Sequence, residues 1–215
     1  MLPELEHLGQ VHFADLNERN NIDDMAARLL PALPDNAIII GFSLGGYVAR
    51  HLAWLALKQG KAINGLVLLN TSARASTADE DNKNRQQIKL LEHYPYKGQT
   101  MTALRRALHP ERQDDDVMLA HLLAMSLALG KQVFVQQLSI VRADGHHELS
   151  GIACPALVVA SRNDQMRSLA ESEKLAHGLP IARLHIIEDC GHMSPLEKAP
   201  ELITVLDEWL RHIQL

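Results

Sequence analysis

Short runs of apolar residues alternate along this chain with longer segments in which apolar residues recur at helical spacing. The short runs are rich in Val, Ile and Leu, which is typical of buried strands. Five strands are predicted in this way: Gln10–Leu16, Ala37–Phe42, Ile63–Asn70, Pro155–Ser161 and Ala182–Glu188. Helices are predicted over residues 22–33, 44–58, 169–177 and 200–213. Apolar strands interleaved with helices predict an α/β fold, with a mostly parallel sheet that carries helices on both faces.

The stretch from Thr71 to Ile152 interrupts this alternation. It begins with the polar segment RASTADEDNKNRQQ and then shows helical patterns without a convincing strand, over residues 86–93, 101–108, 117–129 and 131–142. We predict that residues 71–152 form a helical cap over the carboxyl ends of the strands, while residues 1–70 and 153–215 form the core. The apolar stripe between Leu119 and Leu127 is better explained by helix packing than by a substrate groove, although a lid serves both purposes.

Composition and charge exclude several classes of protein. With 47% hydrophobic and 22% charged residues, the 215-residue chain is an ordinary globular sequence that can bury a core. Its net charge of −5 and its lack of a Lys/Arg run argue against a nucleic-acid partner. Cys154 and Cys190 lack metal-ligand spacing, so we interpret them as small core residues in a reducing compartment. The chain shows neither a basic and apolar leader nor about 18 consecutive apolar residues, and we predict a soluble cytoplasmic protein without a membrane partner.

The segment AIIIGFSLGGYVARHLAWLA places a serine at an unusual corner. A predicted strand runs into Gly41-Phe42-Ser43-Leu44-Gly45, and a helical pattern follows directly. A G-x-S-x-G sequence between a strand and a helix is typical of a nucleophile elbow, a sharp turn that exposes the serine hydroxyl at the top of the sheet. The backbone N–H of Leu44 then lies where it could stabilise an oxyanion. This corner therefore predicts Ser43 as a nucleophile.

A nucleophilic serine needs a base that takes its proton and a carboxylate that keeps this base in one tautomer. Asp164 follows one predicted strand, and His192 lies in a glycine-containing loop after the next strand. We predict Ser43, Asp164 and His192 as catalytic residues, in the chain order that this kind of fold uses. The alternative for Asp164 is a plain helix cap. The other position for an acid, at the end of the third predicted strand, carries the amide of Asn70.

The remaining acidic and histidine candidates give no second site. Glu188 and Asp189 adjoin the histidine loop and are predicted to be solvated. His146 and His147 have no further ligands at helical spacing and are interpreted as exposed residues of the cap. We therefore predict neither a metal nor a cofactor.

The segments GFSLGGYVA, LVLLNTSAR, PALVVASRND and IEDCGHMSPLEKAPE resemble the α/β-hydrolase superfamily, in particular its small esterase-like members with a helical cap. The resemblance covers nearly the whole chain and is weakest in the cap. It implies Ser43 as nucleophile, Asp164 as orienting acid, His192 as general base and acid, and the Leu44 N–H as one oxyanion donor. It also implies that a small ester or thioester is hydrolysed through an acyl-enzyme. Ser43 at the elbow argues against the branches of the family that use an aspartate nucleophile.

The sequence departs from the family pattern at its beginning. Family members begin with an apolar strand and a glycine-rich loop that supplies the second oxyanion N–H, whereas this chain begins within what resembles the first helix. We expect the natural start to lie upstream of Met1. Without the earlier strand, Gln10–Leu16 is expected either to pair with Ala37–Phe42 or to detach as an edge. The alternative function is a non-catalytic protein that binds a small apolar ligand or a partner on the same scaffold.

Overall fold

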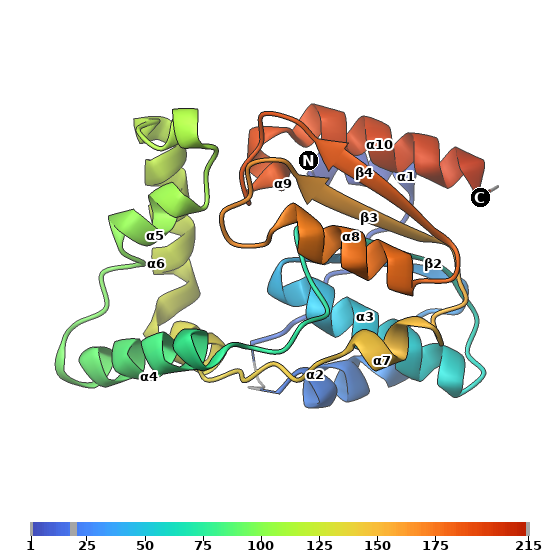
Figure 1. Ribbon diagram of the computed structural model, residues 1–215, viewed down its shortest axis with the longest axis horizontal. Helices are drawn as coiled ribbons and strands as arrows, with labels where there is room; N and C mark the ends of the chain where they lie inside the picture. Colours follow the sequence, from blue (N-terminus) through green and yellow to red (C-terminus); the bar gives the residue numbers. More distant parts are fainter. Residues whose placement is uncertain (1, 18–20, 214–215) are drawn as a thin grey trace.

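The computed structural model describes residues 2–17 and 21–213, and within them a parallel sheet of four strands forms the centre of the molecule. The strands are β1 (Ala37–Phe42), β2 (Ile63–Leu69), β3 (Ala156–Ser161) and β4 (Ala182–Ile187), in the order β1-β2-β3-β4. Every pairing between neighbours is parallel. The predicted α/β class and these strands are confirmed (Figure 1).

Helices cover both faces of this sheet. On one face lie α2 (Ile22–Leu29), the 3-10 helix η1 (Leu30–Ala32), α3 (Leu44–Lys58), α7 (His146–Leu149) and α8 (Leu169–Gly178). On the other face lie α1 (Leu2–Leu8) and α10 (Ala199–His212). Successive side chains of β2 point to opposite faces of the sheet. Leu66 and Leu68 lie in the first core, on the face covered by α3, and Val67 and Leu69 lie in the second core, on the face covered by α10. A strand buried on both faces must be apolar throughout, which explains its continuous apolar run.

The prediction of a strand over Gln10–Leu16 is wrong. This segment contains no strand residue, and its Phe13 is 77% exposed. A strand needs the N–H and C=O groups of a neighbour, and the segment does not pair with β1, the strand at that end of the sheet. Of the two outcomes that we expected, pairing is therefore excluded. Within the described residues β1 is an edge strand, and its Ile40 is 46% exposed.

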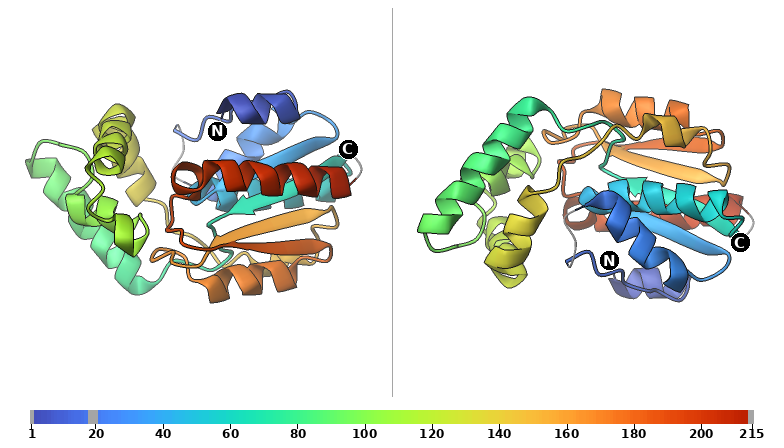
Figure 2. Two further views of the ribbon diagram at one scale, coloured as in Figure 1. Left: turned by 90° about the horizontal axis from the view of Figure 1, so that it is seen from above. Right: turned by 90° about the horizontal axis from the view of Figure 1, so that it is seen from below.

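The cap helices form a separate layer beyond the carboxyl ends of the strands (Figures 1 and 2). They are α4 (Ala78–His93), α5 (Met101–Arg106), the 3-10 helix η2 (Pro110–Arg112) and α6 (Asp116–Leu138). A small apolar cluster packs α5 against α6 and consists of Leu104, Leu108, Leu119 and Leu122. Helix α7 contacts α3 and α8, so it lies on the core rather than in this layer. The boundaries at residues 71 and 152 stay a prediction.

Helix α4 begins earlier than its apolar pattern predicts. The Thr77 hydroxyl accepts a hydrogen bond from the Glu80 N–H at 3.2 Å, and the Glu80 carboxylate accepts one from the Thr77 N–H at 2.9 Å. This reciprocal capping satisfies two N–H groups at the helix start. None of the residues of α4 is buried. Capping and helix propensity therefore stabilise the first turns of α4. These turns lack the helical spacing of apolar residues from which we predicted helices.

Helix α6 is long and apolar enough, by length and composition alone, to cross a membrane. Gly130, at φ 80° and ψ 162°, breaks it into two parts. The longer part, residues 116–129, spans about 21 Å at the usual helical rise, less than the ~30 Å of a bilayer core. The two separate helical patterns predicted on either side of Gly130 are confirmed. In the structure α6 packs against α4 and α5.

Gly65 in β2 is required by its contact with α10. A Cβ atom at this position would lie 2.6 Å from Cη2 of Trp209, whose side chain is fully buried in the second core. We expect Gly65→Ala to lower the free energy of unfolding by about 1–3 kcal/mol, because the core cannot take the extra volume. Urea denaturation measures this change. Gly9→Ala is the control, since no atom lies within 4 Å of a Cβ there; equal midpoints for the two variants would contradict the tight packing.

Candidate active site

Ser43 occupies the turn between β1 and α3. Its φ of 49° and ψ of −114° are strained for a residue with a side chain. The backbone closes tightly around it, and a Cβ on Gly41 would lie 2.4 Å from the carbonyl oxygen of Gly45. The Ser43 N–H donates to the Leu69 carbonyl (2.9 Å), and the Thr71 hydroxyl donates to the Ser43 carbonyl (2.7 Å). The predicted context of strand, sharp turn and helix is thus confirmed.

His192 lies in the loop between β4 and the short helix α9 (Ser194–Glu197). Its Nε2 is 2.9 Å from Ser43 Oγ, and its Nδ1 is 2.8 Å from Asp164 Oδ2. The ring of Phe42 lies beside the imidazole, with 5.2 Å between the ring centroids, and His192 is almost fully buried. His192 thus lies within hydrogen-bond reach of both Ser43 and Asp164. The structure therefore brings together three side chains that follow three different strands.

The carboxylate of Asp164 is buried and fully engaged. One oxygen accepts the backbone N–H groups of Met166 (2.7 Å) and Arg167 (2.9 Å), and the other faces His192. Burial works against ionisation, yet the bond to His192, its charge and the two backbone bonds together lower the pKa of Asp164. These contacts therefore stabilise the fold above the ordinary carboxyl pKa, and this contribution is lost as pH falls through the lowered value.

Asn70 completes the surroundings of Asp164, and sequence reasoning did not assign it this role. It lies just after β2 with a φ of 45°, and its side-chain N–H groups donate to Asp164 Oδ2 (3.0 Å) and Ser161 Oγ (2.8 Å). Its carbonyl oxygen accepts the hydroxyl of Ser194 at 2.5 Å. Position 70, which we considered for an alternative acid, thus carries an amide that donates a hydrogen bond to Asp164, the predicted acid. An amide suits this place because a second carboxylate would repel Asp164.

Glu197 links the histidine loop to the cap and was also missed from the sequence. Its side chain is completely buried. One carboxylate oxygen accepts the Gly191 N–H at 3.0 Å, and the other accepts the His109 N–H at 2.9 Å and a guanidinium N–H of Arg112 at 3.0 Å. Gly191 immediately precedes His192, while His109 and Arg112 belong to the cap around η2. A single buried carboxylate therefore fixes the histidine loop against the cap.

The Leu44 N–H is the first backbone donor of α3. Donors in the first turn of a helix have no acceptor within the helix, and the helix dipole adds partial positive charge there. The position predicted for an oxyanion donor therefore combines an N–H that has no acceptor within its own helix with a favourable field, directly after Ser43 in the chain. This arrangement is what an anionic intermediate at Ser43 would require.

Residues that we placed outside the site lie away from the Ser43 hydroxyl. Glu188 pairs with Arg162 on the surface, and His147 is exposed. The prediction of exposed cap residues is wrong in two respects: His146 is only partly buried and pairs with Asp144 at 2.5 Å, and both histidines lie on α7, which packs on the core. Within residues 2–17 and 21–213, no three His, Cys, Asp or Glu side chains are placed to hold a metal ion.

Both cysteines lie in the apolar cores. Cys154 and Cys190 are buried and carry free thiols. Burial raises the pKa of each thiol to about 11. Thiols with such pKa values stay protonated at neutral pH and are poor nucleophiles. The interpretation of both cysteines as small core residues is confirmed.

Comparisons with known proteins agree with this geometry. A model of the alpha/beta hydrolase family matches residues 4–204. A pimeloyl-[acyl-carrier protein] methyl ester esterase of Aromatoleum aromaticum is 30% identical over 203 residues, which cover 84% of this chain and 76% of that relative. A 2-hydroxy-6-oxononadienedioate/2-hydroxy-6-oxononatrienedioate hydrolase of Burkholderia vietnamiensis is 28% identical over 202 residues, which cover 87% of this chain and 68% of that relative.

Solved structures show the same fold. A thermophilic esterase from Thermogutta terrifontis superposes with a TM-score of 0.79 at 22% identity, over 93% of this chain and 75% of that chain. The enol-lactonase from Burkholderia xenovorans superposes with a TM-score of 0.71 at 22% identity, over 89% of this chain and 73% of that chain. With a family model that spans most of its length, this chain belongs to the alpha/beta hydrolase family and is a hydrolase.

Proposed function

We propose that this protein is a serine hydrolase that cleaves a small carboxylic ester or thioester through an acyl-enzyme. The observation that carries the proposal is the position of His192, whose ring nitrogens lie 2.9 Å from Ser43 Oγ and 2.8 Å from Asp164 Oδ2. A nucleophile, a base and an orienting acid within hydrogen-bond reach are the requirement for catalysis by serine. The name of the methyl ester esterase among the relatives supports ester cleavage.

Each residue has a defined part in the proposed reaction. Ser43 Oγ attacks the carbonyl carbon of the substrate, and His192 Nε2 accepts the hydroxyl proton. The Asp164 carboxylate keeps the other proton on Nδ1 and stabilises the imidazolium. The Leu44 N–H donates to the oxyanion of the tetrahedral intermediate.

The acyl-enzyme forms and then breaks down by the same proton transfers. When the first intermediate collapses, the bond to the leaving group breaks, and the His192 imidazolium gives its proton to the departing alcohol or thiol. Water then loses a proton to His192 and attacks the carbonyl carbon of the Ser43 ester. Release of the carboxylic acid returns the proton to Ser43 Oγ, which restores the starting state.

Glu197 is proposed as a positioning residue for this reaction. It does not touch Ser43, but it accepts the N–H of Gly191, the residue before the catalytic base. Its other oxygen accepts donors from the cap. The carboxylate thus sets the distance of the imidazole from Ser43 through the backbone of the loop. A displacement of about 1 Å at such a contact can cost about 10²-fold in rate.

Ser43→Ala tests the nucleophile. We expect the variant to lose the burst of p-nitrophenol that a short p-nitrophenyl ester gives when the acyl-enzyme forms, because no other hydroxyl among residues 2–17 and 21–213 is paired with His192. Stopped-flow absorbance measures the burst, and thermal unfolding checks that the fold is kept. Ser150→Ala is the control and should keep the burst, because Ser150 is exposed at the end of α7. A burst in Ser43→Ala would show that another residue is acylated.

Glu197→Gln tests the positioning role. The amide keeps the shape of the side chain but turns one acceptor into a donor that faces an N–H group, so we expect a loss of about 1–3 kcal/mol in the free energy of unfolding. We also expect kcat to fall more than KM changes, since the substrate does not touch Glu197. Glu201→Gln, at an exposed glutamate of α10, is the matched control. Unchanged kcat in a destabilised Glu197→Gln protein would limit Glu197 to a structural role.

A further inference from the structure

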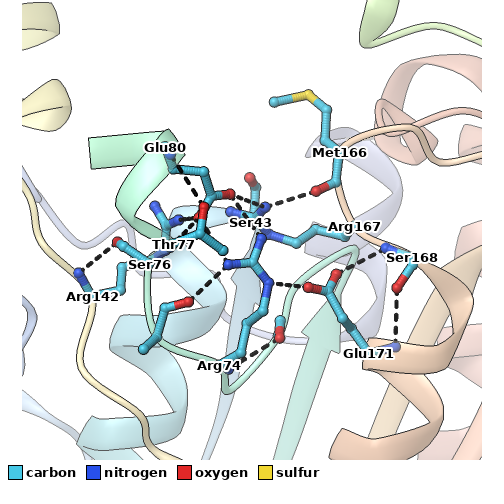
Figure 3. A network of polar contacts seen from close by, with 12 residues as sticks. Ser43, Arg74, Ser76, Thr77, Glu80, Arg142, Met166, Arg167, Ser168 and Glu171 are labelled. Carbon is cyan, nitrogen blue, oxygen red and sulfur yellow. Dashed lines mark hydrogen bonds and ion pairs between the residues drawn. The ribbon is translucent and has the colours of Figure 1, made fainter. Parts of the chain in front are cut away.

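Three arginines from different segments meet beside the active site, and we call Arg74, Arg142 and Arg167 the arginine cluster (Figure 3). Arg74 and Arg142 lie on the two connections between core and cap. These connections run side by side, and the Ser76 N–H donates to the Arg142 carbonyl oxygen at 2.9 Å. Arg167 comes from the loop after β3. The cluster therefore lies where the cap joins the core.

Two carboxylates contact the arginine cluster in the described part of the chain. Both oxygens of Glu80 accept from Arg74, at 2.7 and 2.8 Å, and one also accepts from Arg142 at 3.0 Å. Glu171 pairs with Arg74, whereas Arg167 only approaches Glu80, at 3.9 Å. The bonds from Arg74 lower the pKa of Glu80 to about 2, so this carboxylate is ionised at neutral pH. Three guanidinium groups against two carboxylates leave one positive charge in excess.

The excess charge lies close to Ser43. The guanidinium carbons of Arg142 and Arg167 lie 5.4 and 5.7 Å from the ring centroid of Tyr47. Tyr47 follows Ser43 by one turn of α3, a rise of about 6 Å. The backbone N–H of Arg167 also donates to Asp164 Oδ1 at 2.9 Å, which ties this arginine to the carboxylate beside His192. Figure 3 shows Ser43 among the side chains of the cluster.

Arg142 and Arg167 keep donors that the fold does not use. The guanidinium group of Arg74 donates hydrogen bonds to Glu80, to Glu171 and to a neighbouring backbone carbonyl oxygen. By contrast, the Nε–H groups of Arg142 and Arg167 are buried and have no acceptor among the described residues. Their side chains are 12% and 11% exposed, so both guanidinium groups are largely desolvated. Buried donors without acceptors are uncommon and call for a functional explanation.

A carboxylate fits these two arginines. The planar guanidinium group presents parallel N–H donors that match the two oxygens of a carboxylate, and such pairs gain strength where water is excluded. Both groups also lie over the ring of Tyr47, at cation–π distance. An anion bound to these two guanidinium groups would balance the excess charge of the cluster.

We propose that Arg142 and Arg167 form a subsite for a carboxylate of the substrate, so that the preferred ester carries a free acid at the far end of its acyl chain. This inference rests on the proposed function, because it places the ester carbonyl at Ser43. A short dicarboxylic chain reaches from the serine across one turn of α3 to the two guanidinium groups. The substrate class is thus the hemi-ester of a short dicarboxylic acid.

Two p-nitrophenyl esters test the subsite: the mono-ester of glutaric acid and the neutral ester of pentanoic acid. We expect the native protein to favour the glutarate mono-ester in kcat/KM by about 10- to 100-fold. Arg142→Met and Arg167→Met should each reduce that ratio, mainly through KM for the charged ester. Arg162→Gln is the matched control, because this arginine pairs with Glu188 on the surface. A native ratio near one, or a ratio that both methionine variants leave unchanged, would overturn the subsite.

Binding without turnover separates this inference from the proposed function. In the Ser43→Ala protein, glutarate should raise the thermal midpoint more than its neutral diamide does, and Arg167→Met should remove the difference. Arg167→Lys, which keeps a charge beside Glu80, should retain part of it. If neither ester is hydrolysed and glutarate still stabilises, the proposed function fails and the subsite stands. Equal shifts with glutarate and the diamide would refute the subsite.

Discussion

The site depends on the backbone of Ser43, which holds φ 49° and ψ −114° at the turn between β1 and α3. Such a conformation costs on the order of 1–3 kcal/mol and persists only where the surroundings enforce it. Here the close approach of Gly41 to Gly45 enforces it, together with the hydrogen bonds to Leu69 and from Thr71. The turn aims the hydroxyl at His192, and the Leu44 N–H that follows it has no acceptor within α3. The nucleophile and its proposed oxyanion donor therefore come from one strained residue and its neighbour.

The parallel sheet brings the remaining groups to the same edge. Asn70, Asp164 and His192 each follow a strand, so they meet at its carboxyl end although they are far apart in sequence. The cap meets this edge through several contacts, and two of them are the buried carboxylate of Glu197 and the arginine cluster. We propose that the first contact orients His192 and that the second binds a carboxylate of the substrate. The proposed positioning of the base and the proposed selection of substrate both depend on the junction between core and cap.

The sequence predicted the convergence of Ser43, Asp164 and His192 better than the contacts that surround them. Ser43, Asp164 and His192 could be found because each follows an apolar run, and strand ends of a parallel sheet converge. Glu197 was missed because a local pattern does not show which distant N–H groups a buried carboxylate will accept. The strand over Gln10–Leu16 was mispredicted because alternation describes one segment and says nothing about a neighbour to pair with it. The sequence thus predicted local structure within a segment. It predicted contacts between distant segments only where both segments follow strands of the parallel sheet.

Covalent capture of the serine tests the account most directly. A fluorophosphonate probe reacts with a serine hydroxyl that a base activates, and intact mass with peptide mapping locates the adduct. We predict a single adduct on Ser43 in the native chain, formed about 10²-fold or more faster than in His192→Gln. A folded native chain that stays unlabelled, or that is labelled at the same rate after His192→Gln, would contradict the claim that this junction activates Ser43.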